Sequence, residues 1–497
     1  MNQTPLRLTP AKIAFFVLLT LILAAGAFLR FSNLDQPLLD FHPTRQLFSA
    51  IKARGMYYQT VTDAPAWQKD ISYRQWQGEA TIEPPLVENI TVFFYTRRGQ
   101  ENTAFPRAVS ASCWLIAAVF VYLLSKNLTN SPPAAAVSTA FFLLIPYAIP
   151  ASRAFQPDPL MVMLITISWW SLETWGRKNT WHWAILAGLS GGLAIFVKLP
   201  AVFFIASGAI GVILAYSSLV SAFKNLKAWL LALLCILPPV AYLYYGLYVA
   251  GFLGQQFGGR FFPEFWFDPY FYLRWLLKVD LVIGIFWLSL ALIGWLVFAA
   301  KPVKTFLAAL WGGYILYGLV FPHHIASHDY YSLPLIPLAA LCLAPLTADL
   351  LPRIWKAATS HFAQIILLLS SFFFLLAYTA ITYLEIRQAD TRPAVEAYAQ
   401  IGEALQHQPG IIALTEDYGY PLAYYGWQNV SLWYPADDCE QGFNQQTFEK
   451  AYFVVTDFDE LARQPELAKK LAGYQVFAQS REYSIYDLKA PLPSATP

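Results

Sequence analysis

Long apolar runs separated by short polar connections fill the first 384 residues of the chain. A helix that crosses a membrane needs roughly 20 predominantly apolar residues, and about eleven runs approach that length. The pattern therefore predicts an α-helical polytopic membrane protein with about eleven transmembrane helices. The runs are Ile13–Leu29, Ala108–Leu124, Ala134–Pro150, Leu160–Trp175, Trp183–Val197, Ala201–Leu219, Trp229–Val249, Leu281–Ala299, Phe306–Phe321, Leu333–Leu351 and Ile365–Leu384. The two runs that flank Lys198 and Pro200 form either two helices or one long bent helix.

Two long stretches lie outside the apolar runs. The first, 31–107, is the first outer loop of a transmembrane domain that covers 1–384. Within it, Thr44–Arg54 is predicted to form a short amphipathic helix at the membrane interface. The second stretch, 385–497, is predicted to form a small α/β domain. Its expected elements are helices Arg392–Gln406 and Glu460–Leu471, strands Ile411–Leu414 and Tyr452–Thr456, and a terminal strand pair within Tyr474–Tyr486.

The charges of the connections predict how the chain is oriented. Cytoplasmic loops of membrane proteins carry an excess of Lys and Arg. If the N-terminus is cytoplasmic, every inner connection is basic and nearly free of acid, whereas the outer loops are mixed in sign. An odd number of spans then places the stretch 385–497 on the extracytoplasmic side. The inner basic residues are Arg7, Lys12, Lys126, Arg177, Lys178, Lys224, Lys227, Lys301, Lys304, Arg353 and Lys356.

Composition excludes several classes of protein. Hydrophobic residues make up 57% of the chain and charged residues 13%, which rules out a soluble globular domain and a disordered chain. The formal net charge of +2 gives no basic face, so nucleic acid is not an expected partner. Four cysteines are too few for a disulfide framework.

The densest polar signal is the segment Asp40–Gln46, about ten residues after the first apolar run. It brings together the carboxylate of Asp40, the imidazole of His42 and the guanidinium of Arg45. These groups can deprotonate a hydroxyl and bind a phosphate. Taken alone, the segment is also compatible with a solvated loop that caps the following helix.

Four further polar clusters fall on the same outer face. Glu83 stands on a rigid Pro-Pro turn, and Arg153 and Asp158 lie at the outer mouth of two spans. Lys198 stands between two apolar runs, where a lone charge is costly unless it reaches water or pairs with an anion. The fourth cluster holds three of the seven histidines, followed by a Tyr-Tyr pair: His323, His324 and His328. Taken alone, each cluster is also compatible with an ordinary turn or helix cap. Their joint significance comes from the predicted topology, which places all of them on one side of the membrane.

Other catalytic signatures are absent from the sequence. No phosphate-binding P-loop, GxSxG, GxGxxG after a strand, HExxH or CxxC motif occurs. Nucleotide-driven, serine-hydrolase, dinucleotide-binding and zinc-protease chemistry therefore have no support.

The order of the motifs along residues 10–385 resembles the GT-C integral-membrane glycosyltransferases. It is most similar to the family-39-like branch, which includes bacterial aminoarabinose transferases and protein O-mannosyltransferases. The resemblance rests on Asp40, the Glu83-Pro84-Pro85-Leu86 stretch, Pro157-Asp158, Lys198-Leu199-Pro200 and His328–Pro337. Two positions differ from the family, which often has Asp-Glu where this chain has Asp40-Phe41 and often Lys where this chain has Glu83.

The resemblance implies a GT-C fold with a small extracytoplasmic domain in the plasma (inner) membrane of a bacterium. It also implies transfer, with inversion, of a sugar from a polyprenyl-phosphate donor to a lipid, glycan or protein acceptor. The donor already carries a good leaving group, so the protein must deprotonate the acceptor and stabilise the leaving phosphate.

Asp40 is the predicted base. Glu83 and Asp158 either orient the acceptor or bind a divalent metal ion, which is a candidate cofactor. The predicted donor-phosphate ligands are His42, Arg45, Arg153, Lys198, His324 and His328.

Three other functions remain open at this stage. A lipid-linked sugar transporter or flippase would have the same apolar pattern, although transporters tend to show inverted repeats and charges at mid-membrane. A glycan polymerase or ligase would use the same donor with another acceptor. An interaction protein acting through its tail is disfavoured by the outer-face acid and base residues.

Overall fold

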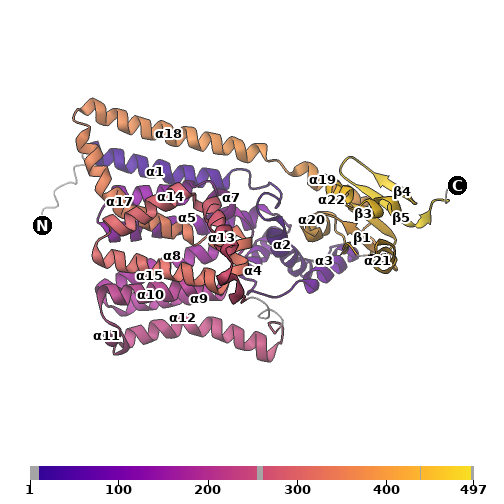
Figure 1. Cartoon of the computed structure of the whole chain (residues 1–497), viewed down its shortest axis with the longest axis horizontal. Coiled ribbons are helices and arrows are strands. Elements are labelled where there is room, and N and C mark those ends of the chain that lie inside the picture. The colour runs from indigo at the N-terminus through magenta and orange to yellow at the C-terminus, as the bar shows by residue number, and fades with distance from the viewer. Residues whose placement is uncertain (1–9, 255–260, 437, 494–497) are drawn as a thin grey trace.

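The computed structural model describes residues 10–254, 261–436 and 438–493, and it shows a bundle of long helices with a small sheet domain beyond one end (Figure 1). The predicted apolar runs fall mainly in helices, but the run Ala134–Pro150 is divided into two helices at residues 145–147, where Pro146 interrupts it, so its prediction as one span is wrong. By length and composition, six of the described helices can cross a membrane, or seven if one bent pair forms a single span, and three more apolar helices are shorter. The protein is therefore a multi-pass membrane protein. Its bundle helices are α1 Pro10–Phe31, α5 Ala104–Thr129, α6 Pro132–Leu144, α7 Ala148–Arg153, α8 Asp158–Lys178, α9 Trp181–Val197, α10 Ala201–Tyr216, α11 Leu219–Phe223, α12 Leu226–Tyr244 with η1 Tyr245–Val249, α13 Pro269–Ile283, α14 Ile285–Ile293 with η3 Gly294–Phe298, α15 Lys301–Val320, α16 Pro322–Ser327, α17 Leu335–Ala357 and α18 His361–Gln388, with the short turns η2 Pro263–Phe267 and η4 Asp329–Ser332.

Two connections in the bundle refine the predictions. The runs beside Lys198 form two separate helices, α9 and α10, because Lys198 is extended and Pro200 starts the next helix. The run Leu281–Ala299, predicted as one span, is broken at Gly284, whose φ of +78° ends α13. The axes of the two halves differ by 88°, so the predicted single straight span is wrong.

Packing distinguishes central from peripheral helices. Large side chains such as Trp114 on α5 and Trp169 on α8 are fully buried, and most of α17 is buried as well. By contrast, α18 has two buried residues among those described, Leu375 and Thr382. Its apolar surface therefore faces the lipid, as expected of an outer helix in a membrane bundle.

The first outer loop folds into three helices: α2 Pro43–Tyr58, α3 Ala66–Gly78 and α4 Leu86–Arg98. The helix predicted at Thr44–Arg54 is confirmed, but it does not lie on a membrane surface. Even its polar residues Gln46, Ser49 and Arg54 are buried. They have partners within the protein, such as Glu88 for Ser49 and Glu101 for Arg54, so neighbouring helices cover α2 on its polar side too.

The C-terminal domain is a five-stranded sheet with the order β2-β1-β3-β5-β4. The first three strands in that order are parallel, and β5 and β4 add antiparallel. Alternate residues of β1 enter two separate cores, Ile411 on one face and Ile412 on the other, so helices cover both faces. Its elements are α19 Arg392–Ala404, β1 Ile411–Leu414, η5 Asp417–Gly419, α20 Tyr420–Tyr425, β2 Val430–Leu432, α21 Cys439–Gln446, β3 Tyr452–Val455, α22 Phe458–Arg463, α23 Pro465–Leu471, β4 Tyr474–Gln479 and β5 Ser484–Pro491.

The sheet domain is tied to the outer loop by α20. The hydroxyl of Tyr425 accepts from the backbone N–H of Leu38 at 2.8 Å, and Tyr424 belongs to the apolar cluster around α2. The guanidinium of Arg54 stacks on the Tyr424 ring at 3.6 Å. In Figure 1, α2 and α3 accordingly lie between the bundle and the sheet. This arrangement places the start of α2 at the meeting point of all three parts of the chain.

Candidate functional site

Polar residues from distant parts of the sequence meet at the start of α2. His42 is the N-cap of this helix and Arg45 lies in its first turn, whereas Glu83 lies three residues before the start of α4. Asp158 is the first residue of α8, and Lys198 follows α9. The structure therefore brings five of the predicted site residues into one region at the tail-facing end of the bundle.

His42 forms a hydrogen-bonded pair with Asp329, which belongs to the His328–Pro337 motif but is not among the predicted site residues. The Nε2 of His42 lies 2.6 Å from Oδ1 of Asp329. Burial alone would raise the pKa of Asp329, but the hydrogen bond from His42, followed by the charge of that ring and a hydrogen bond from Tyr147, lowers it. Asp329 thus fixes the orientation of the imidazole through Nε2 and leaves Nδ1 as the nitrogen available to a substrate. The side chain of His42 is 31% exposed, so a substrate can reach it.

Two further ion pairs lie beside this dyad. Arg45 donates to the carboxylate of Glu83, and Lys198 Nζ lies 2.8 and 3.1 Å from the two oxygens of Asp158. Burial alone would raise the pKa of Glu83, but Arg45 and then Lys198 lower it. The Lys198 ammonium also lies 5.1 Å from the ring centroid of Tyr330. Because the ring of Tyr330 packs edge-on against His42, this tyrosine joins the dyad to the cations.

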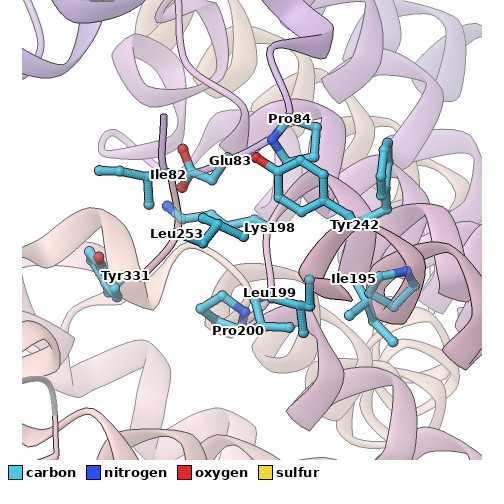
Figure 2. Close-up of a pocket in the computed structure, with 13 residues that line it drawn as sticks. Ile82, Glu83, Pro84, Ile195, Lys198, Leu199, Pro200, Tyr242, Leu253 and Tyr331 are labelled. Carbon is cyan, nitrogen blue, oxygen red and sulfur yellow. The ribbon is translucent and has the colours of Figure 1, made fainter. Parts of the chain in front are cut away.

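A small pocket of about 70 Å³ opens between these charges and the ends of α9 and α12. Figure 2 shows the carboxylate of Glu83 and the ammonium of Lys198 directed toward one another at its polar end. The remaining wall is apolar. The lining residues are Ile82, Glu83, Pro84, Ile195, Phe196, Lys198, Leu199, Pro200, Pro239, Tyr242, Leu243, Leu253 and Tyr331. A ligand with a charged head and an apolar tail matches this division.

Lys52, on α2, is a third cation of the region and was missed from sequence. It is 4% exposed, and among the described residues it has no hydrogen bond or ion pair. Its ammonium lies 4.7 Å from the centroid of the Phe48 ring. Burial lowers the pKa of Lys52, and the nearby Glu88 opposes that shift. A buried unpaired ammonium is unfavourable, so Lys52 adds a driving force for binding an anion here.

Asp40 has a different environment from the one expected of a base. Both of its oxygens accept from the buried Arg107, at 3.0 and 2.7 Å, and Gln46 donates to one of them at 3.2 Å. Burial alone would raise the pKa of Asp40, but the charge and hydrogen bonds of Arg107 lower it. A carboxylate held this way is a weak proton acceptor. Arg107 lies in the first turn of α5, the span after the outer loop, and no periodic pattern in the sequence indicates its pairing with Asp40.

Replacing Asp40 by asparagine tests the holding role. We expect the free energy of unfolding to fall by about 1.5–3 kcal/mol, because a charged hydrogen bond to Arg107 is replaced by a neutral one. Thermal unfolding of the detergent-solubilised chain measures this loss, with the exposed Asp35→Asn as control. Unchanged stability together with abolished transfer would return the base role to Asp40.

The remaining predicted ligands lie at the edge of the site. Arg153 donates to the backbone carbonyls of Ser32 and Asn33 at 2.9 and 2.6 Å, so its guanidinium is used in holding the loop. His328 pairs with Ser327 at 2.7 Å, and the ring of His324 packs 5.2 Å from that of Tyr331. Their roles in phosphate binding stay predictions. Among the described residues, no group of three or more His, Cys, Asp or Glu side chains is arranged to hold a metal ion, and the divalent ion stays a prediction.

Comparisons with known proteins agree with this architecture. A family model described as dolichyl-phosphate-mannose-protein mannosyltransferase matches residues 83–245. The fold is similar to ArnT from Cupriavidus metallidurans in the apo state, with a TM-score of 0.61 at 15% identity over 96% of this chain and 98% of that one. The same protein bound to undecaprenyl phosphate gives 0.60 at 15% identity, over 94% and 97%.

A more distant likeness extends to an oligosaccharyltransferase. AglB from Archaeoglobus fulgidus, in complex with an inhibitory peptide and a dolichol-phosphate, gives a TM-score of 0.53 at 11% identity, covering 90% of this chain and 70% of that one. No curated protein matches by sequence. The predicted GT-C fold, with its small C-terminal sheet domain, is confirmed.

Proposed function

We propose that the protein is an inverting glycosyltransferase that moves a sugar from a polyprenyl phosphate to an acceptor hydroxyl. The reaction takes place at the extracytoplasmic face of a bacterial inner membrane, with the N-terminus in the cytoplasm. The observation that carries the proposal is one juxtaposition: an imidazole–carboxylate dyad beside buried cations at the polar end of an apolar pocket.

The cations fit the donor's phosphate. Lys198 lines the polar end of the pocket, and Arg45 and Lys52 lie near Glu83, which lines it as well. The guanidinium of Arg45 can bind two phosphate oxygens at once. Without a donor, the guanidinium of Arg45 forms an ion pair with the carboxylate of Glu83. A donor phosphate would take that place, and the buried Glu83 would then pair with Lys52 or Lys198. The apolar wall formed by residues such as Leu199 and Leu243 would contact the first isoprene units.

The dyad fits the acceptor. The oxygen of the acceptor hydroxyl attacks the anomeric carbon as the bond from that carbon to the phosphate oxygen breaks on the opposite face. The hydroxyl proton passes to Nδ1 of His42, and Asp329 stabilises the resulting imidazolium. The bonding electrons leave with the phosphate, whose growing charge is stabilised by Arg45 and Lys198. A single displacement of this kind inverts the anomeric centre.

This assignment moves the base from Asp40 to His42. The carboxylate of Asp40 is fully used by Arg107, whereas His42 is oriented and partly exposed. Glu83 and Asp158 keep the cations in place between turnovers. The similar folds support the donor class, since ArnT binds undecaprenyl phosphate and AglB binds a dolichol-phosphate.

A transfer assay tests the proposed function. The full chain in lipid vesicles is supplied with polyprenyl phosphates that carry radiolabelled hexoses or pentoses, together with a membrane extract as the acceptor source. Label that moves to a new acceptor supports a transferase, and its size separates a single-sugar transferase from a polymerase or ligase. Label that only crosses the bilayer would establish a flippase instead and overturn the proposal.

Replacing Arg45 by alanine tests the phosphate contact. We expect the Kd for polyprenyl phosphate to rise about 10–100-fold, because a hydrogen bond to a charged group is worth about 1.5–3 kcal/mol. Binding is measured with sugar-free undecaprenyl phosphate, and the exposed Arg98→Ala serves as control. An unchanged Kd would move the phosphate role to Lys198 or the histidine cluster.

A further inference from the structure

A second, larger cleft lies between the outer loop and the C-terminal domain. Its volume is about 650 Å³, which is in the range of sites that bind small ligands. One wall comes from α2, α3 and Glu79, and the other from the segment between η5 and β2. None of the sequence motifs points to it, since ten of its sixteen lining residues belong to the C-terminal domain.

The walls of the cleft are fixed to one another. Thr44 donates to Asp417 at 3.2 Å, and the hydroxyl of Tyr420 donates to Glu79 at 2.8 Å. The amide of Gln75 donates to the backbone oxygens of Ala423 and Gln428, at 2.8 and 3.0 Å. The cleft is therefore a preformed feature of the docked domains.

Two amides in the lining have unused hydrogen-bonding capacity. Gln428 is fully buried, and neither its Oε1 nor its Nε2 has a hydrogen-bond partner among the described residues. The Oε1 of Gln75 is buried and unpartnered as well. Buried polar groups in folded proteins are nearly always hydrogen-bonded. These atoms lie just behind the surface of the cleft, so a ligand would satisfy them by way of a small side-chain shift, and hydroxyl or amide groups have the donors and acceptors to do so.

Two tyrosines add exposed aromatic faces to the same cleft. Tyr418 is 74% exposed and Tyr434 is 61% exposed. The backbone around Tyr418 is unusual, because Asp417, Tyr418 and Gly419 have consecutive φ values of 50°, 55° and 75°. Left-handed conformations are rare for a bulky residue such as tyrosine, so the fold maintains an unfavourable turn that leaves this ring in solvent.

We propose that this cleft binds the glycan portion of the acceptor, an inference that rests on the proposed transfer reaction. Neutral hydroxyl-rich groups match the uncharged lining of Gln75, Gln428, Asn429 and Ser431, and sugar rings present apolar C–H faces to tyrosines. The lining contains one cation, Arg74, and one carboxylate, Glu79. A cleft with so little net charge and so many polar groups suits neither a polyanion nor a lipid chain.

The cleft also lies close to the proposed catalytic dyad. Thr44 forms part of its lining and lies two residues after His42. Tyr420 is close enough to Arg45 for that charge to act on the tyrosine's pKa, which burial raises. A glycan in the cleft would therefore present one hydroxyl at the start of α2, where the base is located.

Binding of free oligosaccharides tests this inference. The probes are neutral tri- to hexasaccharides of glucose, mannose and N-acetylglucosamine, added to the full chain in lipid nanodiscs and detected by saturation-transfer NMR. We expect at least one to bind, with a Kd raised tenfold or more by Tyr418→Ala or Tyr434→Ala. The control is Phe477→Ala, an exposed aromatic on β4 at the opposite edge of the sheet, which should change the Kd less than twofold.

The outcomes separate this inference from the proposed function. If no oligosaccharide binds, or if the two tyrosine variants bind as the wild type does, the glycan assignment is wrong. Tyrosine-dependent binding of an unstructured peptide in place of a glycan would also overturn it. Undecaprenyl phosphate binding is measured on the same samples. If undecaprenyl phosphate does not bind, the transferase proposal is refuted. Tyrosine-dependent binding of an oligosaccharide would even then show that the cleft is a glycan site.

Discussion

Replacing His42 by asparagine is expected to lower the rate of sugar transfer by about 10²–10⁴-fold, the usual contribution of a general base. The neutral amide of asparagine cannot accept a proton from the acceptor hydroxyl. Asparagine tolerates the left-handed backbone of position 42, where φ is 43°, so the start of α2 should be preserved. The Kd for undecaprenyl phosphate should stay within about twofold, since the cations are untouched.

The measurement is kcat with a radiolabelled polyprenyl-phosphate sugar. His407→Asn is a matched control, because His407 is also a histidine with a positive φ, 54°, and lies in the C-terminal domain stacked on Trp67. Asp329→Asn should reduce kcat as well, since the imidazole loses the carboxylate that selects its tautomer. Full activity in His42→Asn would exclude the dyad as the base.

The second large effect is expected at Lys198. Replacing it by methionine leaves Asp158 as an unpaired buried carboxylate, and breaking a buried pair in this way costs about 3–5 kcal/mol. The Kd for undecaprenyl phosphate should rise at least tenfold, because a cation at the polar end of the pocket is lost. Thermal unfolding and lipid-phosphate binding are measured on the same preparation.

A double variant separates stability from binding at this pair. In Lys198→Met combined with Asp158→Leu, both charges are replaced by apolar groups, so much of the lost stability should return. Binding should not return, because no cation is restored. Recovery of wild-type affinity in the double variant would show that Lys198 has only a structural role.

The elements of the fold were predictable where local pattern determines them. Apolar runs of spanning length became helices, and strands such as Ile411–Leu414 have the predicted bounds. Prolines and glycines explain most differences: Pro465 divides the predicted helix Glu460–Leu471 into α22 and α23. The three-residue strand β2 was missed because its residues are only half-buried and give no apolar run.

The site was predictable in its residue types and in its location, but not in its pairings. The excess of Lys and Arg in the inner connections, together with the positions of the loops, was enough to predict that Glu83, Asp158 and Lys198 lie on one face. Which acid meets which base depends on tertiary contacts between distant segments, as for Asp40 with Arg107 or His42 with Asp329. No spacing rule within one helix or strand encodes such pairs. Only these contacts therefore favour His42 over Asp40 as the proposed base.

Helix α18 carries the chain from the bundle toward the sheet domain as one continuous helix. With 28 residues it is about 42 Å long at 1.5 Å per residue, which exceeds a hydrocarbon core of about 30 Å. It packs mainly along α1 and leads directly into α19 of the sheet domain. Its apolar part, Ile365–Leu384, is about 30 Å long and matches that core, so the polar last turn of α18 extends beyond it. The length of this last turn therefore sets how far from the membrane the sheet domain begins.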